Sequence, residues 1–148
     1  MQKIMISMLL ALTFSISSST KVNEVVSDKK NAIYWQDNTS SKESSEDWND
    51  AVSYCDALIL SGLEHWRLPT FKELFSIVDY ARVDPAINPV FSFVKEGTYW
   101  TSTTFSPSKA RAWTIDFRTG KTYYNYTTTS HAVRCVKDMS LTSVKESK

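Results

Sequence analysis

Glycine, histidine and cysteine are all scarce in this chain of 148 residues, which holds three glycines, two histidines and two cysteines. Three glycines are too few to build a glycine-rich phosphate loop, and no GxSxG pattern marks a serine nucleophile. His65 and His131 stand in no metal-binding spacing such as HExxH or a Cys/His cluster. The sequence therefore predicts a protein that is not an enzyme and holds no cofactor, although a Ser–His–Asp arrangement assembled by folding remains open.

The chain also lacks an excess of charge of either sign and an apolar run long enough to span a membrane. Without Lys3, 16 basic residues face 16 acidic ones, which argues against nucleic acid as a partner. The apolar run at residues 4–16 follows Lys3 and precedes small residues, as in a secretory signal peptide, and it is shorter than the roughly 20 residues that span a bilayer. We expect a signal peptide at residues 1–19, a periplasmic or secreted location and no membrane span after cleavage. An uncleaved N-terminal anchor is the alternative.

The two cysteines, Cys55 and Cys135, both lie in apolar surroundings. Exported proteins meet an oxidising compartment, so a disulfide between the two is expected. It would close a loop of about 80 residues and stabilise the fold by roughly 4 kcal/mol in the chain-entropy model. Two free structural thiols are the competing interpretation.

Helical periodicity is confined to the first half of the chain. Apolar residues recur at helical spacing from Trp48 to Ile59, and Gly62 is expected to end this helix. A second helix is expected over residues 71–81, because Thr70 and Glu73 have the spacing of a capping box. Its buried, apolar face is expected to consist of Phe71, Leu74, Phe75 and Val78.

The sequence "WRLP" at residues 66–69 separates the two expected helices. Pro69 disfavours a helical backbone at the preceding residue, so we expect a stiff corner here. Trp66 and Leu68 are expected to fill the core, with Arg67 pointing away or bonding backbone carbonyls. Ligand binding by Arg67 is the alternative.

Strand-forming residues dominate the second half, in contrast to the first. The turn "RTGK", in which Gly120 can take a positive φ, joins two of the expected strands into a hairpin. A short strand is also expected at residues 31–37. The later strands are expected at residues 98–105, 110–117, 122–129 and 131–138. The whole pattern predicts an α+β fold with two helices packed on a small antiparallel sheet.

The late hairpin carries the best candidate binding surface. Flat aromatic rings can stack on sugars, and arginine or lysine can bind sulfate or carboxylate. The candidate ligand-binding residues are Arg111, Arg118, Lys121, Tyr123, Tyr124 and Tyr126. Strand alternation is expected to place Tyr124 and Tyr126 on one face. The alternative is that these tyrosines pack a half-buried sheet whose edge the cations merely solvate.

The "DPAINP" loop offers oxygen ligands, from Asp84 and Asn88, for a hard cation such as calcium. No motif supports such a site, and we assign no metal-binding residue.

The motifs "WRLPT", "INPVF", "YWTST" and "VRCVK" occur in the order seen in the Lcl C-terminal domain family, which the chain resembles over residues 25–137. This is a family of bacterial exported modules. The resemblance implies a C-type-lectin-like fold in which Cys55 and Cys135 form the long disulfide from a helix to the last strand. It also implies adhesion through sulfated glycans such as glycosaminoglycans.

We therefore expect a non-catalytic exported domain that binds a glycan or another envelope ligand. A structural or protein-interaction domain of the bacterial envelope, without a saccharide site, is the alternative. Residues 138–148 are expected to form a flexible tail.

Overall fold

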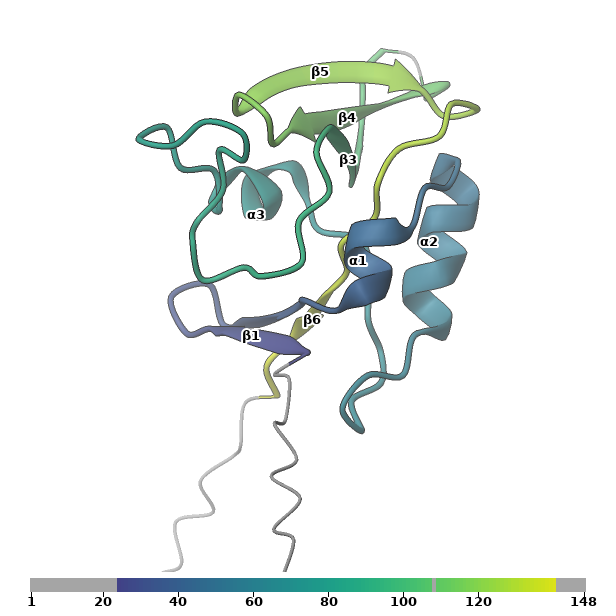
Figure 1. Cartoon of the computed structure of the whole chain (residues 1–148). Helices are drawn as coiled ribbons and strands as arrows, with labels where there is room; N and C mark the ends of the chain where they lie inside the picture. Colours follow the sequence, from purple (N-terminus) through teal and green to yellow (C-terminus); the bar gives the residue numbers. More distant parts are fainter. Residues whose placement is uncertain (1–23, 108, 141–148) are drawn as a thin grey trace, which may run out of the picture.

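The computed structural model describes residues 24–107 and 109–140. Within these ranges the chain forms three helices and two antiparallel sheets, each of three strands (Figure 1). The α+β class is confirmed, but the single sheet expected from the sequence is replaced by two. The expected signal peptide at residues 1–19 and residues 141–148 of the expected tail lie outside the described residues.

The first sheet joins the two ends of the described chain. Its strands are β1 (Val25–Asp28), β2 (Ile33–Gln36) and β6 (Val136–Asp138), in the order β1-β2-β6. The strand expected at residues 131–138 is therefore much shorter. Asp138, the last residue of the expected strand and the first of the expected tail, pairs with Ile33 in this sheet.

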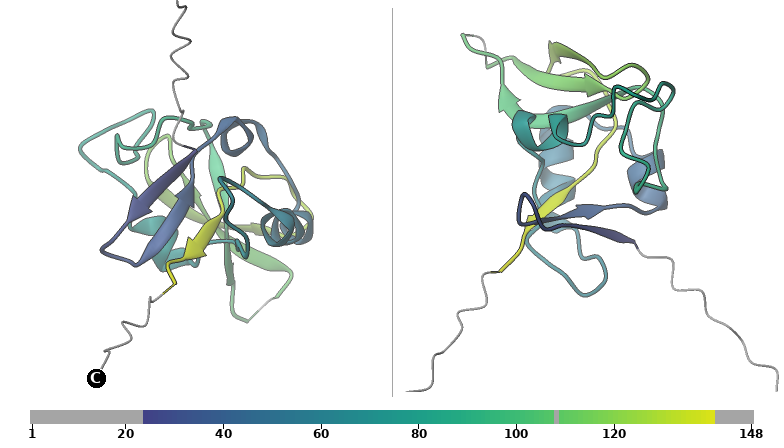
Figure 2. Two further views of the ribbon diagram at one scale, coloured as in Figure 1. Left: turned by 90° about the horizontal axis from the view of Figure 1, so that it is seen from below. Right: turned by 90° about the vertical axis from the view of Figure 1, so that its left-hand side faces the viewer.

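The second sheet has the order β3-β4-β5, with β3 at Thr98–Thr104, β4 at Arg111–Asp116 and β5 at Lys121–Tyr126. The predicted hairpin is confirmed: β4 and β5 are antiparallel, and Gly120 takes a φ of 76° in the turn between them. Two sheets form because Ala132 makes only one bridge to β3, at Tyr99, before the chain turns away to pair with β2. Figure 2 shows this closing segment running from one sheet to the other.

The first two helices are α1 (Thr39–Glu43) and α2 (Trp48–Ala57). Helix α1 was not expected; Asn38 caps it through a hydrogen bond from the Ser41 amide. Helix α2 ends at Ala57 with Leu58 as its C-cap, so the prediction that Gly62 ends it is wrong. Gly62 instead lies in a tight turn closed by mutual backbone hydrogen bonds between Leu60 and Leu63.

Helix α3 (Phe71–Phe75) begins as predicted but is shorter than the expected 71–81. The capping box is confirmed, since Thr70 and Glu73 each accept from the other's backbone amide. The helix stops because the backbone beyond it pairs with a later segment: Val78 bridges Ile87, and the Asp79 amide donates to the Ala86 carbonyl.

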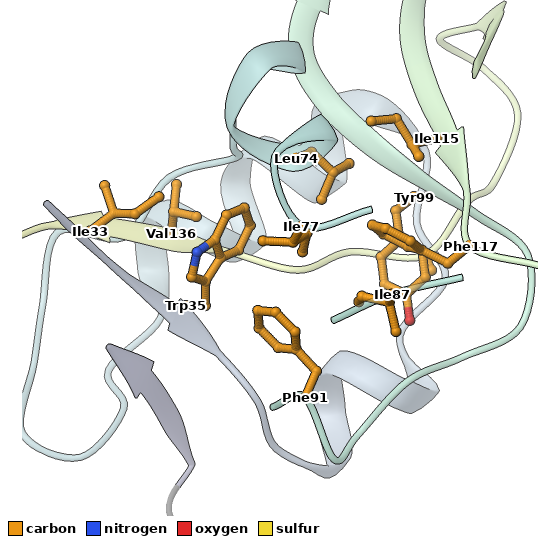
Figure 3. Packing of buried hydrophobic residues seen from close by; sticks show 11 residues of the cluster. Ile33, Trp35, Leu74, Ile77, Ile87, Phe91, Tyr99, Ile115, Phe117 and Val136 are labelled. Carbon is orange, nitrogen blue, oxygen red and sulfur yellow. The ribbon is translucent and has the colours of Figure 1, made fainter. Parts of the chain in front are cut away.

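Two apolar clusters fill the space between the sheets. The larger, shown in Figure 3, places Trp35 of β2 edge-to-face against Phe91 with ring centroids 6.0 Å apart. The smaller surrounds Cys55 of α2 and Cys135 directly before β6, which are fully buried and form the predicted disulfide with Cα atoms 5.6 Å apart.

Arg134 is fully buried next to this disulfide, which the sequence analysis did not foresee. Its guanidinium is 3.1 Å from the Asp37 carboxylate, lies over the Phe91 ring at 4.8 Å and donates to the Phe93 carbonyl. The Asp37 carboxylate in turn accepts from the amides of Ser92 and Phe93. Buried charge thus fastens the loop around residue 92 to β2.

Candidate binding surface

The "WRLP" corner has a structural role. Trp66 and Leu68 are buried, as predicted, and the indole of Trp66 donates to the Leu63 carbonyl at 2.9 Å. Arg67 does bond a backbone carbonyl, that of Leu68, but its main partners are carboxylates. It grips both oxygens of Glu73 at 2.8 and 2.9 Å and also binds Asp138 at 2.7 Å, linking the corner to α3 and β6.

The six predicted ligand-binding residues of the hairpin do not form one surface. In the register of the hairpin, Trp113 is opposite Tyr124 and Arg111 is opposite Tyr126, so these four side chains share a face. Tyr123 and Lys121 are opposite Thr114 and Asp116, on the other face. The expectation that Tyr124 and Tyr126 lie on one face is confirmed.

Arg118 lies just after β4 and is committed to an ion pair. Its guanidinium donates to both carboxylate oxygens of Asp116, the closest approach being 2.8 Å. Burial raises the pKa of Asp116, but its hydrogen bonds to the Arg118 side chain and backbone together outweigh burial and hold the pKa below its ordinary value. Arg118 is therefore paired with a carboxylate within the turn, although its side chain is 58% exposed.

The face that holds Tyr124 continues into a chain of aromatic rings, which we call the aromatic strip. Its neighbouring ring centroids lie 4.2 to 6.3 Å apart. Arg111 joins it at the far end through its contacts with two tyrosines. The strip consists of Tyr80, Phe75, Phe71, Trp113, Phe105, Tyr124, Arg111 and Tyr126.

Exposure is uneven along the strip. Phe71, Phe105 and Trp113 are partly buried, and the exposed rings pack against them. The exposed members are Phe75 at 38%, Tyr124 at 44%, Tyr126 at 54% and Tyr80 at 67%. Large apolar rings with this much exposure on adjoining elements form a surface that another molecule can cover.

The exposed rings are held in place by their neighbours. Tyr124 stacks on Phe105 with centroids 4.2 Å apart and meets Trp113 edge-to-face at 5.6 Å. Arg111 donates to the Tyr126 hydroxyl at 2.6 Å and lies over that ring at 4.2 Å. At the other end, the Tyr80 hydroxyl donates to the Gly120 carbonyl at 3.1 Å, which ties the strip to the hairpin turn.

Sequence reasoning missed half of this surface. Phe71 and Phe75 were assigned to the buried face of a helix, whereas their rings stack on each other at 5.7 Å and Phe75 reaches solvent. Their spacing of four residues was the only available signal that the two rings adjoin. Nothing in the sequence pointed to Tyr80, because its place depends on the unexpected end of α3.

Three hollows among the described residues, of about 440, 510 and 630 Å³, lie beside the "WRLP" corner, beside the β1–β2 turn and between β1 and the loop around residue 92, and their linings hold no residue of the strip.

Within the described residues, no group of three or more His, Cys, Asp or Glu side chains could hold a metal ion. Of the two calcium candidates, Asp84 is exposed with a φ of 51°, and the Asn88 side-chain oxygen already accepts from the Val90 amide. No helix in the described parts of the chain is long and apolar enough to cross a membrane.

The fold and its surface define a small α+β domain, braced by one long disulfide, with an open aromatic face. A family model, the Lcl C-terminal domain, matches residues 24–137, and the chain belongs to this family. No curated protein matches the chain.

Proposed function

We propose that the chain is a non-catalytic, exported binding domain of the bacterial envelope that recognises a glycan through the aromatic strip. The observation that carries the proposal is the pair of exposed rings Tyr124 and Tyr126, backed by Phe105, Trp113 and Arg111. Export to the periplasm or the cell surface fits the buried disulfide, which an oxidising compartment favours.

Rigid tyrosines suit this task for a physical reason. A tyrosine offers a broad apolar ring and a hydroxyl that bonds polar groups, and it has few rotatable bonds to freeze on binding. Because Tyr124 and Tyr126 are already fixed by their neighbours, little conformational entropy is left to lose. A sugar can place its C–H face on the rings and its hydroxyls at the rim.

The architecture supports a C-type-lectin-like fold. A disulfide that joins an early helix to the last segment brings the two ends of the domain together, and it leaves the hairpin and the 76–97 loops free to vary. A role in surface adhesion follows if the exposed face is the one that meets the ligand.

The test uses two adjacent tyrosines as a matched pair. Tyr124 and Tyr123 have the same exposure, 44%, but lie on opposite faces of β5. We expect Tyr124→Ala to weaken binding on a glycan array about tenfold, the loss expected for a stacked aromatic contact, and Tyr123→Ala to leave binding unchanged. Equal losses for both variants would remove the strip from consideration. Arrays with and without calcium test the role of that ion.

A second candidate is a structural or protein-interaction domain of the envelope with no saccharide site. It is favoured by exposed aliphatic side chains that are not members of the strip, namely Ile59 at 67%, Val90 at 53% and Val83 at 75%. Cross-linking that captures one stoichiometric partner, with a blank glycan array, would support this function instead.

A further inference from the structure

We infer that the aromatic strip takes an uncharged polysaccharide chain, whose sugar rings stack along it, and not a sulfated or carboxylated one. This inference rests on the proposed function and adds the chemical class of the ligand. It is argued from the location and pairing of the three cations of the hairpin, Arg111, Arg118 and Lys121.

The basic residues of the hairpin do not converge on the strip. Lys121 lies on the opposite face of β5, and Arg118 donates to both oxygens of Asp116. A polyanion would have to compete with that carboxylate for the guanidinium fork. Ion pairing of this geometry satisfies an arginine locally and leaves little charge to attract a distant sulfate.

Arg111 is the single charged residue among the eight of the strip, and it acts there as a support for the rings. Its guanidinium lies over Tyr126 at 4.2 Å and over Tyr124 at 5.5 Å, and it donates to the Tyr126 hydroxyl. In this position it orients two stacking rings. One cation is also too few for a sulfated polymer, which carries charge on successive sugars.

The arrangement of the rings favours an extended ligand over a single sugar. Exposed rings occur at both ends of the strip, with Tyr126 and Tyr124 on β5 and with Phe75 and Tyr80 at and beyond the end of α3. The partly buried rings of Phe71 and Trp113 connect these ends, with centroids 5.4 Å apart. A chain of sugars can use both ends, so Phe75 and Tyr80 are binding residues in addition to those of the hairpin.

The experiment measures the binding of the full-length chain to pairs of polymers that share a backbone. Suitable pairs are dextran with dextran sulfate, hydroxyethylcellulose with carboxymethylcellulose, and laminarin with sulfated laminarin. Affinity is measured by calorimetry in 50 mM and 500 mM NaCl, because salt weakens contacts between exposed charges and leaves stacking largely unchanged.

Two sets of variants sharpen the result. Tyr80→Ala removes a ring that is 67% exposed, so folding should survive, and we expect a loss of affinity of roughly threefold to tenfold. Tyr80→Phe keeps the ring but removes its hydrogen bond to the Gly120 carbonyl, so it should lose less affinity than Tyr80→Ala. The double variant Arg118→Gln with Lys121→Gln removes two charges and should leave affinity for the neutral polymer unchanged. Thermal melting of each variant checks that it is folded.

Binding to a neutral polymer that changes less than about twofold between the two salt concentrations, together with the loss in Tyr80→Ala, supports the inference. Binding confined to the charged polymers, lost at high salt and weakened by the double charge variant, overturns it while the proposed glycan function stands. If no polymer of either kind binds, the proposed function and this inference both fall.

Discussion

Two groups of aromatic residues in this domain differ in burial and in what satisfies their polar groups. Around the disulfide, Trp66 and Trp100 are buried, and each indole donates to a backbone carbonyl at 2.9 Å. In the aromatic strip, Tyr124 stacks on Phe105 and Tyr126 packs against the Arg111 guanidinium, and both tyrosines stay exposed, at 44% and 54%. The buried group has every polar atom of its indoles satisfied inside the fold. The strip has polar groups and ring faces that solvent or a ligand can reach.

Because of this difference, we expect the buried region to determine stability and the exposed strip to determine binding. The disulfide, the corner at residues 66–69 and β6 form a junction whose contacts are internal, so changes there should alter the free energy of unfolding. Changes to exposed rings of the strip should alter binding with little effect on unfolding. Mutations can therefore test each region in turn.

Removing the disulfide should have the largest effect on the junction. We expect the double variant Cys55→Ala with Cys135→Ala to lose about 4 kcal/mol in the free energy of unfolding, because the bond closes a long loop in the unfolded chain. Urea denaturation followed by tryptophan fluorescence measures this loss. An unchanged midpoint would show that the junction does not depend on the bond.

Gly120→Ala should alter both stability and binding, because Gly120 lies in the hairpin turn and next to Tyr80 of the strip. A Cβ here would lie 2.7 Å from Val78 Cγ1 and 2.8 Å from Tyr80 Cε1, at a φ of +76° that side chains rarely adopt. We expect a loss of about 2 to 3 kcal/mol in stability and weaker binding, since Tyr80 must move.

Gly62→Ala is the matched control for this change. Gly62 has nearly the same φ, +74°, with nothing within 4 Å of an added Cβ, so this variant should show the backbone strain alone and normal binding. Equal effects of the two substitutions would mean that the contact with Tyr80 does not matter.

Arg67→Ala should weaken the junction less than loss of the disulfide. The variant leaves the half-buried Glu73 and the exposed Asp138 without their shared partner. Because the Arg67 side chain is 37% exposed, water screens these contacts, and we expect a loss of about 1 to 2 kcal/mol. Arg67→Lys keeps the charge without the two-pronged grip, and should recover less than half of the loss in urea titrations.

Local patterns in the sequence predicted local structure well. The capping box of Thr70 and Glu73 and the turn at Gly120 each depend on residues within a few positions, and both are confirmed. The disulfide was also predicted, since an exported chain with two cysteines offers one pairing. The candidate site was half predicted, because alternation along β5 placed Tyr124 and Tyr126 on one face.

What the sequence could not predict depends on distant partners. Helix α3 stops early because residues beyond it pair with residues 86–88, and β6 joins a separate sheet because its partner β2 lies about a hundred positions earlier. An arginine such as Arg134 is expected on the surface, and its burial depends on its ion pair with Asp37, 97 positions away. The position of Tyr80 in the strip depends on the first of these long-range pairings.

Acid should weaken the junction through Glu73. Burial raises the pKa of Glu73, but hydrogen bonds from Arg67 and from the Thr70 backbone together outweigh burial and hold the pKa below the ordinary value of 4.5. A carboxyl with a lowered pKa stabilises the fold above pH 4.5, and this contribution is lost as the pH falls through the value in the folded state. We expect less than about 1 kcal/mol, since the partner is partly exposed. Glu73→Gln should show a flatter fall in unfolding free energy between pH 5 and pH 3, the window on the order of one unit around the ordinary carboxyl pKa.

His131 should give the smallest effect, in a separate pH window. Its ring meets Trp100 edge-to-face at 4.6 Å and contacts Thr98 and Thr129, and burial lowers its pKa from 6.5. As the pH falls below 6.5, the unfolded chain takes up the proton first, so stability should drop by a few tenths of a kcal/mol before the folded state is protonated as well. Carboxyl groups whose pKa is held low stay charged throughout this range. The slope of the unfolding free energy against pH, between pH 7 and pH 5 and roughly centred on the ordinary histidine pKa, therefore reports the imidazole and not these carboxyl groups. In His131→Gln that slope should vanish, whereas binding to the strip at neutral pH should not change. A slope that persists in the variant would place the titrating group elsewhere.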